Sequence, residues 1–562
     1  MKTNRLAGTI LLAALACSAT TTGCAVDEND LARWETTLGG PRRLSAVVVH
    51  DKYPHALRVS AAMSLIRMKP RKGRAVGIER LVKGALVCDP EFIKPDEPCT
   101  KAQLGPEERT QILSDLVPLI VAELEEPPPE PAQGGQAAPD PSFPYKDAAF
   151  LMLTYEDAQV VPDPGLRKQL EEALTKWAMA DFDNRLNDRT QAYGMEQLLR
   201  HIGPSSVKGL PALMTKEGKN LAKMADIIAK IADKSTREEA SKKLVEIAEY
   251  IASEKWRKDK LPELKEANRK AGFDPTEKQL EKQMADFQEE SVTRVYSSMK
   301  KVGGDAVVNY AIGVAANGKE ATKRRQTALA ALEGHIDRKN DKQIDKLIEL
   351  ASDKKAPPEV VDQAFRRIRE LPREKVIGKL YAFFEGEDWK IRRLAGATIL
   401  QMSKVEHVDE FLDKLDAKAT KNFNLPEAIT YGAYLSSLKG GDPLKALEPH
   451  MNKGGVRSRL TAISYWYEKG NKKDLSKLEP YERDRMGVPK CDDEDACDWS
   501  CLVPQGDKKE SKTVETVGDF VSYCIKPKMA ETDPEEKKSE GDSGKEEKKQ
   551  DGAKKEDDED DK

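Results

Sequence analysis

Four cysteines near the C-terminus are the residues with the most chemistry to offer. They follow the spacing C-x5-C-x3-C-x22-C and are Cys491, Cys497, Cys501 and Cys524. Structural zinc sites usually pair their ligands as C-x2–4-C, a spacing that only Cys497 and Cys501 meet. In an oxidising compartment such thiols form disulfides instead. We therefore predict two disulfides among them, whose pairing the sequence leaves open.

The other candidate patterns lack residues that their chemistry requires. The acidic run 492–495 could attract calcium, but it has neither the turn glycine nor the terminal Glu of an EF-hand loop. The string 313–320 is close to a phosphate-binding loop, but Glu320 stands where Ser or Thr would hold magnesium. None of the six histidines forms a recognised metal-binding pair, although three could still converge in space. The sequence predicts no catalytic residue, no metal site and no cofactor.

The first 24 residues have the composition of a bacterial export signal. Two cations precede an apolar stretch at 6–16, which is too short to remain in a bilayer as a helix. Residues 21–24 resemble the lipobox of bacterial lipoproteins, in which the cysteine is diacylated and becomes the new N-terminus. We expect a signal peptide at 1–23 and a lipid on Cys24, because lipidation at the rival Cys17 leaves an odd number of cysteines. An ordinary secretory signal is the alternative.

Composition divides the rest of the chain. Residues 126–146 are rich in Pro, Gly and Ala and predict an extended linker. Residues 529–562 hold 15 Asp and Glu against 8 Lys and cannot bury enough surface to fold. The body between is close to neutral, so it offers no basic face to nucleic acid. The remaining expected segments are a tether at 24–45, a helical region at 46–125, helical repeats at 147–316 and 317–487, and a Cys-rich cap at 488–528.

A local disulfide is expected within the 46–125 region. Cys88 and Cys99 are separated by a segment that contains three prolines. Proline interrupts helices and favours turns, which brings the two thiols together.

A small pattern recurs inside the predicted helices, namely Arg, then Ala three residues later, then Leu or Ile four after that. Offsets of three and seven return to one face of an α-helix, where Ala allows a neighbouring helix to approach. The copies begin at Arg58 and Ala61, Arg237 and Ala240, Arg325 and Ala328, and Arg392 and Ala395. Weaker copies centre on Ala364, Gly432 and Leu460. From Ala328 onward the successive centres lie 36, 31, 37 and 28 residues apart, which is the length of a helix pair with its turns, and this period predicts a repeat array.

Residues 387–400 resemble the second helix of a HEAT repeat, in the short form also found in phycobilisome-lyase-type proteins. In that family an acidic residue before the helix and an Arg inside it bond across the turn between helices, and Asp388 and Arg392 match these positions. The resemblance implies an all-α fold, an α-solenoid of HEAT-like helix pairs, here with a disulfide-containing C-terminal cap. An irregular helical bundle is the alternative.

The resemblance is uneven along the chain. It is clearest at 317–487, weaker at 46–87 and 185–252, and poor at 253–316. Within the poor stretch, the Lys-rich segment 254–270 interleaves acids with its cations, which predicts a solvated helix face rather than an anion site.

These features favour a binding protein over an enzyme. Stacked helix pairs create a long surface that suits protein recognition. We expect a non-enzymatic bacterial envelope lipoprotein, facing the periplasm or on the outer surface, that acts as a scaffold for protein partners. The alternatives are an envelope enzyme, lyase- or hydrolase-like, and an extracytoplasmic ligand-binding protein that uses the acidic cysteine loop.

Overall fold

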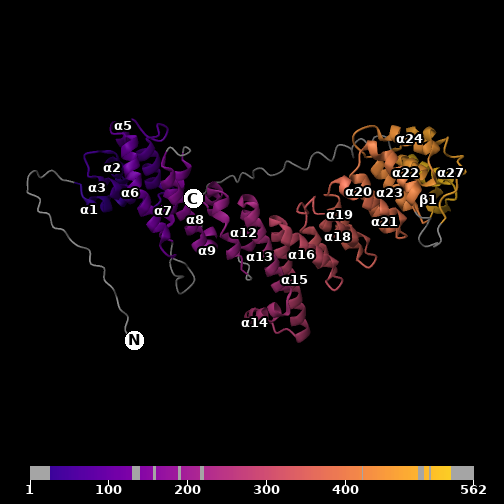
Figure 1. Cartoon of the computed structure of the whole chain (residues 1–562), viewed down its shortest axis with the longest axis horizontal. Helices are drawn as coiled ribbons and strands as arrows, with labels where there is room; N and C mark the ends of the chain where they lie inside the picture. The colour runs from indigo at the N-terminus through magenta and orange to yellow at the C-terminus, as the bar shows by residue number, and fades with distance from the viewer. Residues whose placement is uncertain are drawn as a thin grey trace, which may run out of the picture. The chain divides into compact units, whose positions relative to one another are not determined.

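The computed structural model of the chain is built mainly of α-helices (Figure 1). It describes residues 26–128, 140–155, 160–187, 192–215, 220–419, 422–490, 499–505 and 508–532. The predicted signal peptide, Cys24, Cys491, Cys497 and most of the charged tail lie outside the described residues. The chain divides into two compact units: unit 1 holds residues 1–213 and 230–233, and unit 2 holds residues 214–229 and 234–562.

Unit 1 consists of helices of very different lengths. In chain order they are α1 (Glu28–Glu35), α2 (Gly40–Val49), α3 (His55–Arg67), α4 (Val76–Glu79), η1 (Arg80–Val87), α5 (Pro98–Lys101), α6 (Pro106–Glu125), α7 (Phe143–Thr154), α8 (Pro164–Ala180), α9 (Phe182–Asn187), α10 (Met195–Ile202), η2 (Pro204–Val207) and α11 (Leu210–Leu213). The next helix, α12 (Leu221–Ile231), crosses the boundary between the units.

Unit 2 continues with helices and ends in a small cap. Its elements are α13 (Lys234–Ala252), α14 (Glu254–Lys270), α15 (Glu277–Val302), α16 (Asp305–Ala316), α17 (Thr322–Ala330), α18 (Asp341–Ser352), α19 (Pro358–Ile368), α20 (Arg373–Ala382), η3 (Phe383–Glu385), α21 (Trp389–Gln401), η4 (Val405–His407), α22 (Val408–Lys418), α23 (Leu425–Leu435), α24 (Pro443–Lys453), α25 (Val456–Ile463), α26 (Tyr465–Lys469), η5 (Lys472–Leu478), β1 (Ser500–Gln505), β2 (Lys508–Thr513), α27 (Val517–Asp519), η7 (Phe520–Ile525) and α28 (Lys526–Glu531).

The helices of unit 2 lie in two rows. Successive members of one row, α13, α16, α18, α20, α22 and α24, pack on one another, and so do α15, α17, α19, α21, α23 and α25 in the other row. Each helix is amphipathic and must bury its apolar side against its neighbours. The predicted α-solenoid of helix pairs is therefore confirmed.

The recurring Arg connects each helix to the end of the one before it. In unit 1, Arg58 Nε donates to the carbonyl of Val48 (2.8 Å) at the C-terminus of α2. In unit 2, Arg325 Nε donates to the carbonyl of Ala315 (2.6 Å) near the C-terminus of α16. The last carbonyls of a helix have no partner within it, so a buried cation there satisfies them.

The small residues of the pattern lie where helices approach closely. Ala61, Ala240, Ala328 and Ala395 have no exposed surface. At Gly396 in α21 a Cβ would lie 2.3 Å from the ring of Tyr431 in α23. At Gly432 in α23 it would lie 2.3 Å from the Cβ of Ser464. The second row is therefore packed so tightly at these points that glycine is required.

The predicted linker at 126–146 ends too late. Helix α7 begins at Phe143, and Phe143, Tyr145 and Lys146 are all buried in unit 1. The Trp177 indole N–H donates to the Ser142 hydroxyl (2.6 Å). The last residues of the expected linker thus belong to a core, because aromatic side chains there find partners, and the division between compact units falls near 213 instead.

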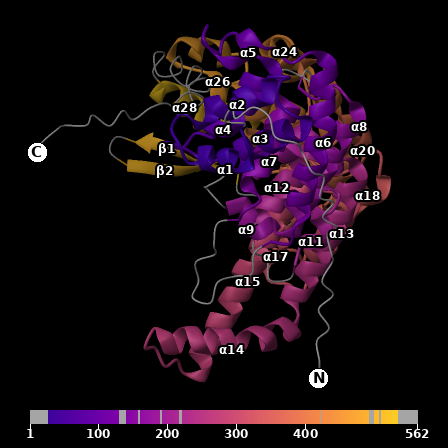
Figure 2. The ribbon, with the colours of Figure 1, turned by 90° about the vertical axis from the view of Figure 1, so that its left-hand side faces the viewer.

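The C-terminal cap combines a β-hairpin with short helices. Strands β1 and β2 pair antiparallel, with Ser500 opposite Thr513, and stand out from the helices in Figure 2. A disulfide joins Cys501 in β1 to Cys524 in η7. Trp499 packs on both Phe423 and Phe520, with ring centroids 6.3 Å apart in each pair, so the cap covers the end of the rows.

Two predicted disulfides are confirmed. Cys88 and Cys99 are bonded, with Cα atoms 5.8 Å apart, and close the loop after η1. Cys501 and Cys524 form the other described bridge, with Cα atoms 5.4 Å apart. The other two C-terminal cysteines, Cys491 and Cys497, lie outside the described residues, so the second bridge predicted among the four remains a prediction.

Candidate interaction site

An inserted hairpin interrupts the rows of unit 2 between α13 and α15. Helix α14 and the first half of α15 stand out from the rows in both Figure 1 and Figure 2. Helix α15 has 26 residues, so it is about 39 Å long at 1.5 Å per residue. Its second half is buried against α13 and α17, whereas α14 buries Trp256 alone. The hairpin thus has a fixed root and a free tip, within the stretch that resembles HEAT repeats poorly.

Polar bonds fix the root of the hairpin. The Ser253 hydroxyl accepts from the Trp256 backbone N–H (3.3 Å) and starts α14 directly after α13. The Gln288 side-chain amide donates to the carbonyl of Ile251 (2.6 Å) at the end of α13. These bonds satisfy groups that helix ends leave open, so α14 and α15 leave the rows at a defined angle.

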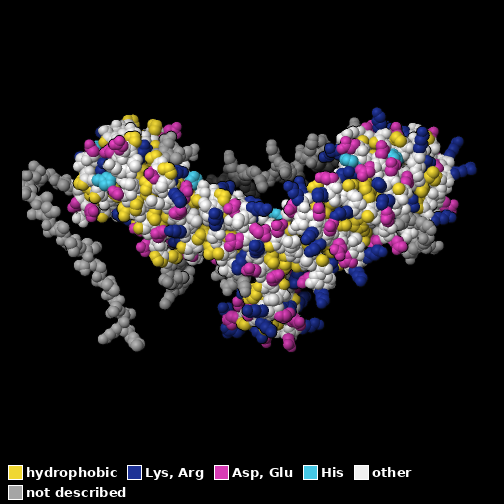
Figure 3. Space-filling model, in the orientation of Figure 1, with side chains coloured by type: hydrophobic (Ala, Val, Ile, Leu, Met, Phe, Trp, Pro, Cys, Tyr) yellow, Lys and Arg dark blue, Asp and Glu magenta, His cyan; other side chains and the backbone are white. Residues whose placement is uncertain are grey.

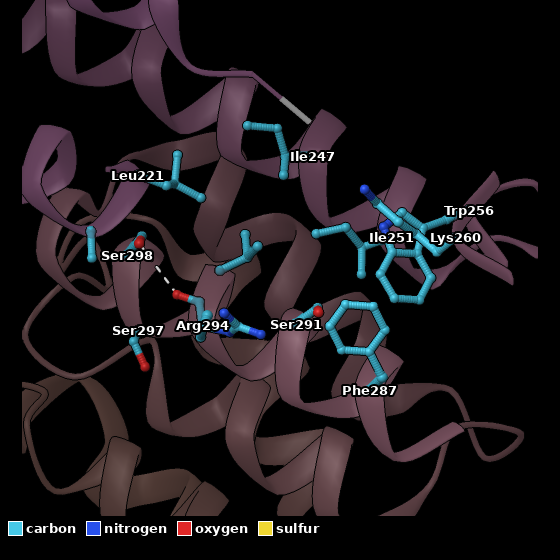
Figure 4. Close-up of a pocket in the computed structure, with 12 residues that line it drawn as sticks. Leu221, Ile247, Ile251, Trp256, Lys260, Phe287, Ser291, Arg294, Ser297 and Ser298 are labelled. Carbon is cyan, nitrogen blue, oxygen red and sulfur yellow. Dashed lines mark hydrogen bonds between the residues drawn. The ribbon is translucent and has the colours of Figure 1, made fainter. Parts of the chain in front are cut away.

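A cavity of about 290 Å³ lies at this root, and all its lining residues belong to unit 2 (Figure 4). Its apolar wall comes from α12, α13 and α15 and comprises Leu221, Ala222, Ile247, Ile251 and Val295. At one end stand Trp256 of α14 and Phe287 of α15, with ring centroids 5.2 Å apart. The opening carries Lys260, Ser291, Arg294 and Ser297, which are partly or fully exposed, and Ser298 is a buried polar residue of the lining. The cavity exists because α14 turns away instead of covering α13.

Four polar residues of the lining bond within the chain. Lys260 Nζ bonds Glu263 (2.8 Å), and Arg294 lies 3.6 Å from Glu290. The Ser298 hydroxyl donates to the carbonyl of Arg294 (3.2 Å), as the dashed line in Figure 4 shows. The Ser297 hydroxyl donates to the carbonyl of Thr293 (3.0 Å). A ligand that enters the cavity would therefore contact mainly apolar and aromatic side chains.

A cluster of polar side chains from α15, α16 and α17 lies beside the cavity. Burial raises the pKa of the Tyr296 phenol and of Tyr310 in α16. Arg324 bonds Glu289 and Glu320, each at 2.9 Å. Both phenols thus stay protonated at neutral pH, so neither supplies a base, and the cluster holds α15 against α16 and α17.

A shallower apolar groove lies farther along the rows. Its volume is about 300 Å³, and Ile348 of α18, Phe383 of η3 and Ile391 of α21 contribute apolar surface. Lys379 and Asp388 lie at its edge. The groove is less aromatic than the cavity at the hairpin root.

The predicted contact of Asp388 with Arg392 takes another form. Asp388 caps its own helix, because its carboxylate accepts from the backbone N–H groups of Lys390 (2.9 Å) and Ile391 (3.3 Å). Arg392 bonds both oxygens of Glu427 in the next repeat, at 3.0 and 2.7 Å. It also reaches across the turn to the carbonyl of Gly386 (2.6 Å). The turn is bridged by an Arg-to-carbonyl bond, and the ion pair joins successive repeats.

The other predicted repeat positions lie on separate helices and form no single site. Arg237 in α13 donates to the carbonyl of Ala229 (2.8 Å), and Arg58 and Arg325 do the same at other helix ends. They are structural positions. The residues of the cavity, above all Trp256 and Phe287, were not predicted; the signal available was a lone Trp in a very hydrophilic helix.

The described residues also bear on metal binding and on membrane spanning. In these residues no group of three or more His, Cys, Asp or Glu is placed to hold a metal ion. No helix in the same ranges combines the length and the apolar character that a membrane span requires.

The fold defines the class of protein: an α-solenoid of helix pairs with a disulfide-containing C-terminal cap. No family model matches the chain, and no curated protein matches it. Among solved structures, the crystal structure of Kap121p matches with 12% sequence identity and a TM-score of 0.24. That match covers 81% of this chain and 47% of Kap121p, so the chain spans about half the length of that protein.

Proposed function

We propose that the chain is a non-enzymatic scaffold of the bacterial cell envelope, exported and held by a lipid on Cys24, that binds protein partners through unit 2. The repeats are proposed to be of the short HEAT-like form. The observation that carries the binding function is the apolar cavity at the root of the inserted hairpin. The lining includes Trp256 of α14 and Phe287 of α15, so the cavity is a feature of the insertion rather than of the repeat.

The cavity suits an apolar side chain of a partner. Burying a Leu or Phe side chain contributes about 1.5–3 kcal/mol. Such anchors dominate protein interfaces when they enter a well-packed pocket surrounded by polar groups. Lys, Arg, Asp and Glu intermingle over the projecting hairpin (Figure 3) and supply that polar surround.

The lining of the cavity also favours binding over catalysis. An enzyme site would bring His, Asp or Glu side chains together inside a pocket. The twelve residues that line this cavity include none of these types. The three Ser hydroxyls have no base beside them in that set, so they resemble no activated nucleophile.

The binding function is tested by site-specific crosslinking of the full chain in its native membranes. A photo-reactive residue at Ser297, at the opening, is expected to capture a distinct partner. The same residue at Gln326, exposed on α17, is the matched control and should not capture it. Ser291→Phe fills the cavity from its opening and should abolish the crosslink, whereas Gln326→Phe should not. A crosslink that survives Ser291→Phe places the partner elsewhere.

The anchor is tested separately by membrane fractionation. Cys24→Ala should release the chain from membranes, because a diacylated cysteine supplies the two acyl chains that stable anchoring requires. If the variant partitions as before, either Cys17 carries the lipid or none does.

A further inference from the structure

Two loops of unit 1 form an exposed tip, which we call the basic tip. It comprises Leu38, in the loop between α1 and α2, and Lys69, Arg71, Lys72 and Arg74, which follow α3. Leu38 is 90% exposed, the highest value among the exposed large hydrophobic residues of the described chain. Lys69, Lys72 and Arg74 are exposed as well. An exposed Leu alone is common on protein surfaces, but here it stands beside a cluster of cations.

Arg71 holds the two loops together. Its guanidinium donates to the carbonyls of Leu38 (3.1 Å) and Thr37 (2.6 Å). Reciprocal backbone bonds between Arg71 and Arg74, at 2.9 and 3.0 Å, close a tight turn. Lys72 and Gly73 inside it both have positive φ, 50° and 75°, as turns of this kind require. Leu38 and the cations thus have a defined arrangement.

The basic tip carries uncompensated positive charge. Glu35 is engaged outside the tip, where it bonds Arg67 (2.8 Å), and Glu79 pairs with Arg74 of the tip (2.7 Å), so the uncompensated charge is that of the lysines. In the described part of the chain, Lys69 and Lys72 have no carboxylate within ion-pair distance. Two lysines beside an exposed Leu offer an anionic surface both charge attraction and apolar contact.

Glu28, Asp30 and the N-cap residue Asp27 lie at the other end of α1, whereas Glu35 ends the helix and bonds Arg67 (2.8 Å). Asp27 and Asp30 cap and begin α1, and Leu38 follows its C-terminus. The eight residues of α1 span about 12 Å, which separates these acids from the basic tip. The surface that unit 1 presents at Leu38 is therefore basic.

We propose that the basic tip contacts the headgroups of an anionic phospholipid membrane and inserts Leu38 among them. Juxtamembrane lysines are attracted to anionic lipid, and an apolar side chain enters the interface. The proposed lipid on Cys24 lies three residues before Asp27, a reach of at most about 11 Å. This inference rests on the proposed anchor only for bringing unit 1 to the bilayer.

The test uses the chain from residue 24 onward with Cys24→Ala, so that no lipid contributes. Vesicles of phosphatidylcholine alone are compared by co-sedimentation with vesicles that also contain phosphatidylglycerol. The chain is expected to bind the anionic vesicles at least tenfold more tightly than the neutral ones. The pair Lys69→Glu and Lys72→Glu should lower that binding at least tenfold, and Leu38→Ser several-fold.

A matched control reverses two exposed lysines in unit 2, with Lys342→Glu and Lys346→Glu, and should bind as the parent does. Circular dichroism checks that each variant remains folded. Equal binding to both vesicle types, no binding to either, or binding unchanged by the Lys69 and Lys72 pair would overturn the proposal. Because no lipid is present, such a failure leaves the Cys24 anchor to its own test.

Discussion

Two parts of unit 2 differ in how completely their helices are packed: the regular repeats from α16 to α25, and the hairpin inserted between α13 and α15. From α16 to α25 the paired helices are joined by short turns, and successive members of each row pack on one another, with a shallow groove beside α18 and α21. Between α13 and α15 the turn has grown into a hairpin that leaves a cavity at its root. The regular repeats thus form a continuously packed array, whereas the interruption leaves an open cavity, at which we propose that a partner binds.

The polar chemistry of the two parts differs in the same way. In the regular part Arg392 and Glu427 are fully buried, and the Tyr431 hydroxyl donates to the carbonyl of Arg392 (2.8 Å). Burial raises the pKa of Glu427, and the bonds from Arg392 oppose that shift. At the cavity the cations Lys260 and Arg294 lie at the opening and bond neighbours on their own helices. We therefore expect that removing the charge of Lys260 or Arg294 changes the free energy of unfolding little.

The largest effect is expected from Arg392→Ala. Removing one partner of a buried ion pair leaves the other charge unpaired and costs about 3–5 kcal/mol. Urea unfolding of the full chain measures the loss. Arg294→Ala, at the exposed opening of the cavity, is the matched control and should change stability by less than about 0.5 kcal/mol. Similar losses from both variants would mean that the side chain of Arg294 at the hairpin root contributes as much to the free energy of unfolding as Arg392 in α21.

The next effect concerns the cap that closes the regular part. Cys524→Ser removes the bridge to Cys501, which lies 23 residues away in sequence. A loop of that size stabilises the fold by about 3 kcal/mol when it is closed by a disulfide. Urea unfolding under non-reducing conditions should therefore show a loss near that value relative to the parent chain. An unchanged midpoint would mean that the aromatic packing of Trp499 alone closes the array.

A smaller effect separates a tight glycine from an open one. Gly396→Ala forces a methyl group against Tyr431 and should cost about 1–3 kcal/mol. Gly313→Ala, in α16, meets nothing within 4 Å and should stabilise by about 0.5–1 kcal/mol. Thermal unfolding of both variants checks the opposite signs. If both changes stabilise the chain, the second row is looser at Gly396 than its geometry indicates.

The smallest effect is expected at the free tip of the hairpin. Phe273 is 46% exposed and lies beyond Gly272, whose φ is +68°. Phe273→Ser should change the free energy of unfolding by less than about 0.5 kcal/mol, as surface changes usually do. Urea unfolding measures it beside Trp256→Ala, which empties the root and should cost several times more. A large loss from Phe273→Ser would show that the tip is part of the core.

Much of the regular part could be predicted from residues alone. The spacing of Arg325 and Ala328 identified a helix face and its small-residue contact, since both depend on the period of one helix. Cys88 and Cys99 paired as expected because only eleven residues separate them. The partner of Arg392 was predicted wrongly, because Asp388 is adjacent in sequence while Glu427 comes close only when repeats stack.

The sequence by itself determined the helical class, the repeat spacing and the local disulfide, because each depends on residues within a helix or a turn of one another. Only the tertiary structure decided where α14 leaves the rows and that Trp256 meets Phe287 across an open cavity. The same holds for the basic tip, where Arg71 brings Leu38 beside a turn about thirty residues later. Such contacts depend on the angle between successive helices, which is set by packing and has no period that can be read along the chain.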